Sequence, residues 1–441
     1  GFADDKNETP SASLLTRRTE AVVVASILLV ALGVRAFNLN NEAAWYDEIV
    51  TVSLLASPTL SEFLSRCQEL SPVAWFNVYE VTEYVWARVI GSSVASIRVL
   101  SILYGLGSLV ALYAFARSLF STRAALLALS WTVFMPWHIY FSQEIRFYSL
   151  VALFSILSMH SLVQVTRTGS TKWIAVNFAL NFLLVWTHIA TAFLLVAQGL
   201  FLLLTRLRKR TMLAIWAGVN GAMALHAYAS QPAFEFDNLD KLVGWIPKPD
   251  VVGDAPSVAS YLKLIAGHSF GVNDLRPFTA WGEALYPAYP VLKWLLTFVA
   301  LAAIGVAIWR MASSPTEASE PDNSELTQRQ RLYLLALWFF VPPFCAFVGS
   351  YALRPMFVER YVIYAAFPVY VLIGYGLSRA RSAWIPAAAL AIPLAMYAAF
   401  QFPGPYRVPF DRIIDTIESN AHDGDVVLTE NTVIYTGLSF Y

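Results

Sequence analysis

Two neighbouring carboxylates, Asp47 and Glu48, stand in a polar segment and are followed at once by the apolar residues Ile49 and Val50. A carboxylate within hydrogen-bond reach of a hydroxyl can take its proton as the oxygen attacks, so the pair could supply a general base. Because adjacent side chains point in different directions, we expect only one of them to act as the base. Asp47 is the preferred choice, and Glu48 is the alternative.

A second group of ionisable side chains, Glu144, Arg146 and Tyr148, lies between two strongly apolar stretches. Charged groups at such an edge are costly to desolvate unless they are paired or face water. Glu144 could therefore position an acceptor or hold Arg146. The simpler alternative is an ion pair that only caps the flanking helices.

Two arginines, Arg354 and Arg360, form a third group with Tyr361. Guanidinium groups can hold a phosphate through two parallel hydrogen bonds, which predicts a phosphate contact. The competing interpretation is that these side chains merely reach from a helix end toward the membrane surface.

No metal site is predicted by the remaining candidate ligands. His188 and His268 have no partners at metal-ligand spacing, so His188 is expected to be a polar cap. A divalent metal stays possible, but no residue is assigned to it. Cys67 and Cys345 cannot build a disulfide framework.

The elements that must position these groups are membrane helices. Hydrophobic residues make up 57% of the 441 residues, charged residues only 14%, and the net charge is zero. A soluble domain has about 25% charged residues, and a neutral chain has no general attraction for nucleic acid. Apolar runs long enough to cross a bilayer predict eleven spans, at about 20–38, 97–117, 124–141, 147–166, 173–187, 189–206, 211–229, 290–310, 332–353, 361–378 and 383–401.

The distribution of Lys and Arg predicts the orientation of these spans. With residues 1–19 as a disordered cytoplasmic N-terminus, every short inner loop is basic, as the positive-inside rule requires. The long segments 39–96, 230–289 and 402–441 then lie outside the cytoplasm, and all three ionisable groups share that outer face. Residues 402–441 are expected to begin a small α/β unit that the chain cuts short. Phe410, Ile413, Ile414 and Ile417 fall at helical spacing, and residues 426–428 are predicted to form a strand.

Short helices in the first outer loop are predicted to lie in the membrane interface. One follows Asp47-Glu48, and a second covers about 72–90, where Trp75, Tyr79 and Trp86 favour the headgroup level. Together they would form a floor at the depth where a lipid-linked substrate presents its headgroup.

The order of these motifs resembles that of the GT-C membrane glycosyltransferases. The motifs are Asp47-Glu48, the stretch Ser96-Ile97-Arg98-Val99-Leu100-Ser101, then Ser142-Gln143-Glu144-x-Arg146-x-Tyr148, and finally Glu359-Arg360-Tyr361. Within that fold the chain is most similar to the protein mannosyltransferases and the lipid A aminoarabinose transferases, over about residues 20–400.

The resemblance implies an all-α polytopic enzyme that moves a sugar from a polyprenyl-phosphate carrier to an acceptor hydroxyl, with inversion. It implies that Asp47, Glu48 and Glu144 match the catalytic acidic positions. Arg360, with Tyr361 and Arg354, matches the region near the carrier phosphate, and Arg146, Tyr148 and His188 would support the site. Residues 20–401 would form the transferase domain.

The sequence departs from that pattern at the second interfacial helix. Many relatives have a His or Lys followed by Pro-Pro-Leu-Tyr there, whereas this chain has Leu70-Ser71-Pro72-Val73-Ala74. The departure removes a basic contact to the donor and puts any metal at that point in doubt.

Two other classes of function stay open. A transporter or flippase of lipid-linked sugars would carry polar residues in mid-span, whereas the charges here gather at the span ends. A non-catalytic membrane subunit would only bind a partner through the outer loops. The resemblance is to bacterial members of these families, and no glycosylation sequon lies on the predicted outer face. Both observations favour a bacterial inner membrane, with the site facing the periplasm.

Overall fold

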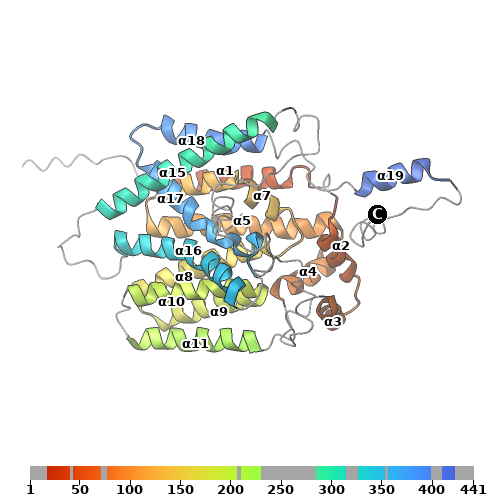
Figure 1. Cartoon of the computed structure of the whole chain (residues 1–441), viewed down its shortest axis with the longest axis horizontal. Helices are drawn as coiled ribbons and strands as arrows, with labels where there is room; N and C mark the ends of the chain where they lie inside the picture. Colours follow the sequence, from red (N-terminus) through yellow and green to blue (C-terminus); the bar gives the residue numbers. More distant parts are fainter. Residues whose placement is uncertain are drawn as a thin grey trace, which may run out of the picture.

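The protein is described by a computed structural model that covers residues 17–39, 43–70, 77–205, 210–229, 284, 286–313, 326–352, 356–398 and 410–422. Among these residues the regular elements are all helices (Figure 1). In chain order they are α1 (Arg17–Ala36), α2 (Tyr46–Leu54), α3 (Leu60–Leu70), α4 (Val78–Val89), α5 (Val94–Leu119), α6 (Thr122–Val133), α7 (Pro136–Ser142), α8 (Tyr148–Thr168), α9 (Thr171–Thr187), η1 (Ile189–Thr191), α10 (Ala192–Leu204), α11 (Arg210–Ala229), η3 (Tyr286–Ala288), α15 (Tyr289–Ser313), α16 (Gln328–Ala352), η4 (Glu359–Ala366), α17 (Phe367–Ser378), α18 (Trp384–Met396) and α19 (Phe410–Asn420).

Each of the eleven predicted spans overlaps at least one of these helices. Within the described ranges, six helices are long and apolar enough to cross a membrane, and α6 with α7 makes a seventh if the bent pair is one span. The polytopic all-α class is therefore confirmed, while the count of eleven crossings stays a prediction. Large apolar side chains such as Leu29, Trp294 and Phe298 are exposed, as expected for surfaces that face lipid.

Three short helices, α2, α3 and α4, gather at one end of the bundle, on the right in Figure 1. The predicted interfacial helices correspond to α2 and α4, and α3 between them was not predicted. Asn77 begins α4, because its side chain accepts a hydrogen bond from the Tyr79 N–H at 2.9 Å. Residues 71–76, at the predicted start of the second helix, lie outside the described residues.

The predicted span 124–141 corresponds to two helices, α6 and α7, and the crossing itself stays a prediction. Helices α6 and α7 are bent by 65° relative to each other. The cause is local: Met135 is extended (φ −70°, ψ 119°), as expected for a residue before proline, and Pro136 then begins α7. The bend directs α7 toward the turn that carries Glu144 and Arg146.

The predicted division of residues 173–206 into two helices is confirmed. His188 is extended between α9 and η1, and α10 then runs back along α9. The Asn181 side chain of α9 donates to Gln198 of α10 at 3.0 Å, so the two helices lie side by side. It also donates to Asn220 of α11 at 2.8 Å. Such hydrogen bonds hold membrane helices together where lipid offers no alternative partner.

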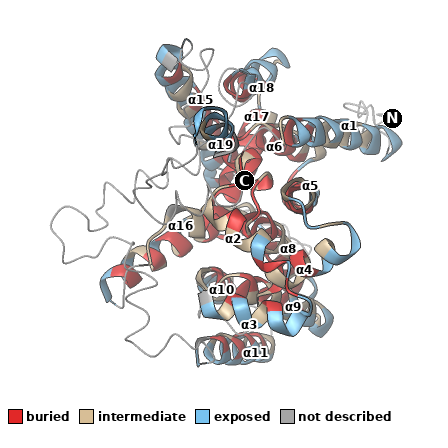
Figure 2. Cartoon of the chain, turned by 90° about the vertical axis from the view of Figure 1, so that its right-hand side faces the viewer, coloured by how far each residue is buried: buried red, intermediate tan, exposed pale blue. Residues whose placement is uncertain are grey.

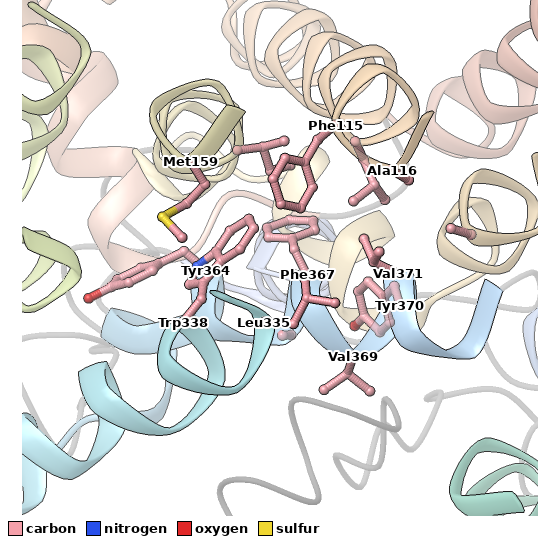
Figure 3. Packing of buried hydrophobic residues seen from close by; sticks show 14 of the residues in the cluster. Phe115, Ala116, Met159, Leu335, Trp338, Tyr364, Phe367, Val369, Tyr370 and Val371 are labelled. Atoms are coloured by element: carbon pink, nitrogen blue, oxygen red, sulfur yellow. The ribbon is translucent and has the colours of Figure 1, made fainter. Parts of the chain in front are cut away.

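Helix α17 is the most buried helix and packs against α6 and α15 (Figure 2). A side chain at Gly374 would collide with the backbone of Ala124 and Ala128, so glycine permits this close approach. At the beginning of α17, Phe367 joins the cluster of Phe115 and Trp338, whose rings meet edge to face at 5.4 Å (Figure 3).

Two predictions at the chain ends have different outcomes. Helix α1 begins at Arg17, slightly before the predicted start at residue 20, and residues 1–16 lie outside the described residues. The helical spacing of Phe410, Ile413 and Ile417 is confirmed by α19. The strand predicted at 426–428 and the outer loop 230–283 lie outside the described residues.

Candidate active site

Glu48 lies on the buried side of the first turn of α2, with no exposed surface. Its carboxylate accepts hydrogen bonds from Arg98 Nε at 3.2 Å and from Arg98 Nη2 at 2.8 Å. It also accepts from the backbone N–H groups of Ile145 (2.8 Å) and Trp45 (3.3 Å). Four donors saturate this carboxylate, so its geometry suits positioning more than proton transfer. Glu48 thereby ties α2 to α5 and to the turn before α8.

Asp47, one residue earlier, points elsewhere and keeps 26% of its side chain exposed. Its Oδ2 lies 3.6 Å from Arg146 Nη2, an ion pair that is open to solvent on one side. The two neighbouring carboxylates therefore have different environments. Asp47 is the one that a substrate hydroxyl can approach.

The turn between α7 and α8 supplies Glu144 and Arg146, and Tyr148 is the first residue of α8. Glu144 is 2% exposed, and its carbonyl oxygen accepts from the Arg146 N–H at 2.8 Å. Burial disfavours the charge of Arg146, but Tyr148, Asp47 and Glu144 outweigh burial and raise the pKa of Arg146 above its usual value. Arg146 is therefore a permanent cation between two carboxylates.

His188 lies at the end of α9, between two aromatic rings. Its ring stacks on Phe147 with centroids 4.4 Å apart and lies 4.5 Å from Tyr361. Burial, together with Arg146 and Arg360, lowers the pKa of His188 to about 3, so the imidazole is neutral. Its Nδ1 has no hydrogen-bond partner in the described structure. This histidine packs as part of the wall of the site.

Arg360 and Tyr361 enter the same neighbourhood from η4. Asp47, Glu144 and Tyr148 all act electrostatically on Arg360. The structure thus brings together the three sequence groups from α2, the α7–α8 turn and η4. Arg354 lies outside the described residues.

Two further carboxylates, Glu80 and Glu83 of α4, were missed by the sequence analysis. Burial raises the pKa of Glu80 to about 7, while Arg146 and Cys67 oppose the shift. Burial and the charge of Glu80 raise the pKa of Glu83 well above its usual value, and Glu83 is only 1% exposed. The available signal was two glutamates spaced i, i+3 on an otherwise apolar aromatic helix, since that spacing places both on one face.

Metal ligands do not cluster in the described part of the chain, where no group of three or more His, Cys, Asp or Glu side chains could hold an ion. Charge compensation at this site comes from Arg98, Arg146 and Arg360. A base beside fixed cations is an arrangement suited to displacing an anionic leaving group such as a phosphate.

Comparison with known proteins places this geometry in a structural class. No protein-family model and no curated protein sequence matches the chain. ArnT from Cupriavidus metallidurans, solved in the apo state, matches 86% of the chain with a TM-score of 0.52 and 15% identity. The same protein bound to undecaprenyl phosphate matches 95% of the chain with a TM-score of 0.53 and 13% identity.

An archaeal protein is similar to the same extent. The oligosaccharyltransferase AglB from Archaeoglobus fulgidus, in complex with an inhibitory peptide and a dolichol-phosphate, matches 93% of the chain with a TM-score of 0.53 and 15% identity. The chain spans 63% of the apo ArnT structure and 59% of that AglB structure. The chain has the GT-C fold, as the order of its sequence motifs predicted.

Proposed function

We propose that this chain is a membrane glycosyltransferase that moves a sugar from a polyprenyl-phosphate donor to an acceptor hydroxyl. The structural neighbours support a transferase of this general kind, because ArnT was solved with undecaprenyl phosphate and AglB with a dolichol-phosphate. The observation that carries the proposal within this chain is the Asp47–Arg146 ion pair at one end of the bundle, to which His188 joins the Arg360–Tyr361 segment through its ring contacts with Phe147 and Tyr361.

In the proposed reaction Asp47 is the general base. The acceptor hydroxyl gives its proton to the Asp47 carboxylate as its oxygen forms a bond to the anomeric carbon. The bond from that carbon to the phosphate oxygen breaks on the opposite face, so the configuration inverts. The polyprenyl phosphate leaves with an added negative charge and needs no proton from a general acid.

The leaving phosphate is stabilised by Arg360, together with Arg354 from the preceding segment. Preorganised cations stabilise growing charge most strongly where water is excluded. Arg146 holds the Asp47 carboxylate from one side at 3.6 Å and keeps it in the site. Glu48 and Arg98 fix the backbone that carries Asp47, since their ion pair is fully buried.

The test is Asp47→Asn, assayed with a panel of undecaprenyl-phosphate sugars and membrane extracts as acceptors. Loss of the base is expected to lower the transfer rate by about 10²–10⁴-fold. Binding of undecaprenyl phosphate should persist. Glu62→Gln is the matched control, because Glu62 is exposed on α3 in the same loop and should transfer at the wild-type rate. Full transfer by Asp47→Asn would remove the proposed base.

Transport is the main alternative, and the polar groups in the spans do not favour it. The buried amides of Asn177, Asn181 and Gln198 hydrogen-bond to one another and to Ser158, and none of the three has exposed surface. A transport path would need such groups to face an opening. Movement of a lipid-linked sugar across proteoliposomes without any acceptor would favour the transporter.

We infer further that the enzyme resides in a bacterial inner membrane, with the site on the periplasmic side. The basic short loops support this orientation. A non-catalytic subunit would bind the lipid-linked sugar without turnover, and the Asp47→Asn assay separates the two. Cysteines introduced at Glu62 and Arg329 should label with an impermeant thiol reagent from opposite sides of inner-membrane vesicles.

A further inference from the structure

A basic pocket of about 260 Å³ opens at the end of the bundle opposite the candidate active site. Four helices meet there: the end of α5, the start of α6, the start of α16 and the end of α17. The lining residues are Arg117, Ser118, Leu119, Phe120, Ser121, Gln328, Arg331, Tyr375 and Arg379. None of these lining residues takes part in the proposed transfer reaction.

The charge of the pocket has one sign. Arg117, Arg331 and Arg379 come from three different helices, and no lining residue is acidic. Glu20 of α1, whose side chain is 20% exposed, pairs with Arg117 Nε at 3.2 Å and offsets part of the charge of Arg117. The helix dipoles roughly cancel, because two helices end here and two begin. The excess positive charge therefore belongs to the arginines.

Aromatic rings hold two of these arginines over the pocket. Phe120 and Tyr375 stack with centroids 4.2 Å apart. The Arg379 guanidinium lies 4.7 Å from the centre of the Tyr375 ring and donates to the Tyr375 hydroxyl at 3.0 Å. Arg331 lies 5.8 Å from the centre of the Phe120 ring and donates from Nε to the Leu326 carbonyl at 3.0 Å. Because the stacked rings of Phe120 and Tyr375 restrict both guanidiniums, less conformational entropy is lost when an anion binds.

Neutral groups complete the lining. The hydroxyls of Ser118 and Ser121 and the amide of Gln328 border the pocket. Gln328 Oε1 is buried and has no hydrogen-bond partner in the described structure. A ligand hydroxyl would supply the missing donor, while the guanidiniums would hold a phosphate.

We propose that this pocket binds the phosphate of a hydroxyl-bearing phosphate ester. The distribution of Lys and Arg predicts that this end faces the cytoplasm, where anionic phospholipids and soluble phosphate esters both occur. Both sources share the same chemistry, a phosphate next to a polyol such as glycerol. Basic pockets between membrane helices on the cytoplasmic side commonly bind lipid headgroups.

The experiment compares two double variants of the purified full chain that carry the same change in net charge. Arg331→Gln with Arg379→Gln removes two pocket cations. Arg329→Gln with Arg381→Gln removes two exposed arginines from the same end that do not line the pocket. Native mass spectrometry measures retention of phosphatidylglycerol against phosphatidylcholine, and a melting curve with added glycerol 3-phosphate in detergent measures soluble binding.

The wild-type chain is expected to retain phosphatidylglycerol in preference to phosphatidylcholine. The pocket variant should lose this retention by about tenfold, which corresponds to the loss of about 1 kcal/mol or less for each cation near the surface. The control variant should change by less than about twofold. If instead glycerol 3-phosphate raises the melting temperature of the wild-type chain and not of the pocket variant, the occupant is a soluble ester.

Two results would overturn the proposal: equal loss in both double variants, which marks general attraction to basic helix ends, or no binding of either probe by the wild-type chain. Arg331→Lys with Arg379→Lys keeps the charge and should retain part of the binding. If the double variant does not fold, the single variant Arg379→Gln, which changes an exposed side chain, replaces it in the same binding measurements.

Discussion

The two ends of the helix bundle use arginine differently. At the candidate active site, Arg98 lies 2.8 Å from Glu48, and Arg146 lies 3.6 Å from Asp47. At the opposite end, Arg331 and Arg379 lie over aromatic rings in a pocket whose lining contains no carboxylate. Cations paired with carboxylates of the same chain therefore fix the geometry of a site. Cations gathered in an acid-free pocket attract an anion from outside.

The largest expected effect on stability within this comparison comes from Glu48→Gln. The change would leave Arg98, itself 1% exposed, beside a neutral group in the protein interior. Breaking a buried ion pair from one side costs about 3–5 kcal/mol, so the melting temperature in detergent should fall sharply. Asp47→Asn is the matched control, because its partly exposed pair contributes about 0–1 kcal/mol. Equal melting temperatures for the two variants would break the distinction between the neighbouring carboxylates.

An intermediate effect is expected from Arg360→Ala. Charge-assisted hydrogen bonds contribute about 1.5–3 kcal/mol, so the apparent KM for the polyprenyl-phosphate donor should rise about tenfold to a hundredfold. Arg360→Lys should recover part of the loss, because an ammonium keeps the charge without the fork of donors. A donor titration identical to that of the wild-type chain would contradict the phosphate contact.

The smallest expected effect concerns Glu80, whose pKa is raised to about 7 by burial. A raised carboxyl pKa means that the folded state binds more protons than the unfolded state between about pH 4.5 and 7. Stability should therefore decrease as pH rises through this window. Glu80→Gln should flatten the decrease, so the variant should match the wild-type melting temperature near pH 4.5 and exceed it near pH 8. If the melting temperature of Glu80→Gln depended on pH in the same way as that of the wild-type chain, a group other than Glu80 would be responsible for the decrease.

Much of the fold could be predicted from the sequence, because a helix that crosses the bilayer needs a run of about 20 mostly apolar residues, and such runs can be recognised in the sequence. The length of residues 173–206, about 50 Å as a single helix and too long for one crossing, indicated the turn between α9 and α10. The bend at Pro136 was missed, although a proline inside a predicted span carried the signal. Hydropathy averages over a window, so a local change in backbone direction does not alter it.

The candidate site was harder to predict than the spans. Asp47, Glu144 and Arg360 could be chosen as candidates because each lies beside an apolar stretch. The pairing of Glu48 with Arg98 was not found, because the two residues are far apart in sequence and only packing brings them together. Glu80 and Glu83 were missed because their i, i+3 spacing places them on one face of α4 but does not show whether that face is buried.

The four donors around Glu48 have a consequence for the order of assembly. Two of them belong to Arg98 and one to the Ile145 backbone, so this carboxylate has a low-energy place in the interior only after α5 and the α7–α8 turn are present. We expect α2, although made early by the ribosome, to dock late. If the later helices were misplaced, the backbone that carries Asp47, the proposed base, would not be held in position. A misfolded chain would then be inactive and would not transfer the wrong sugars.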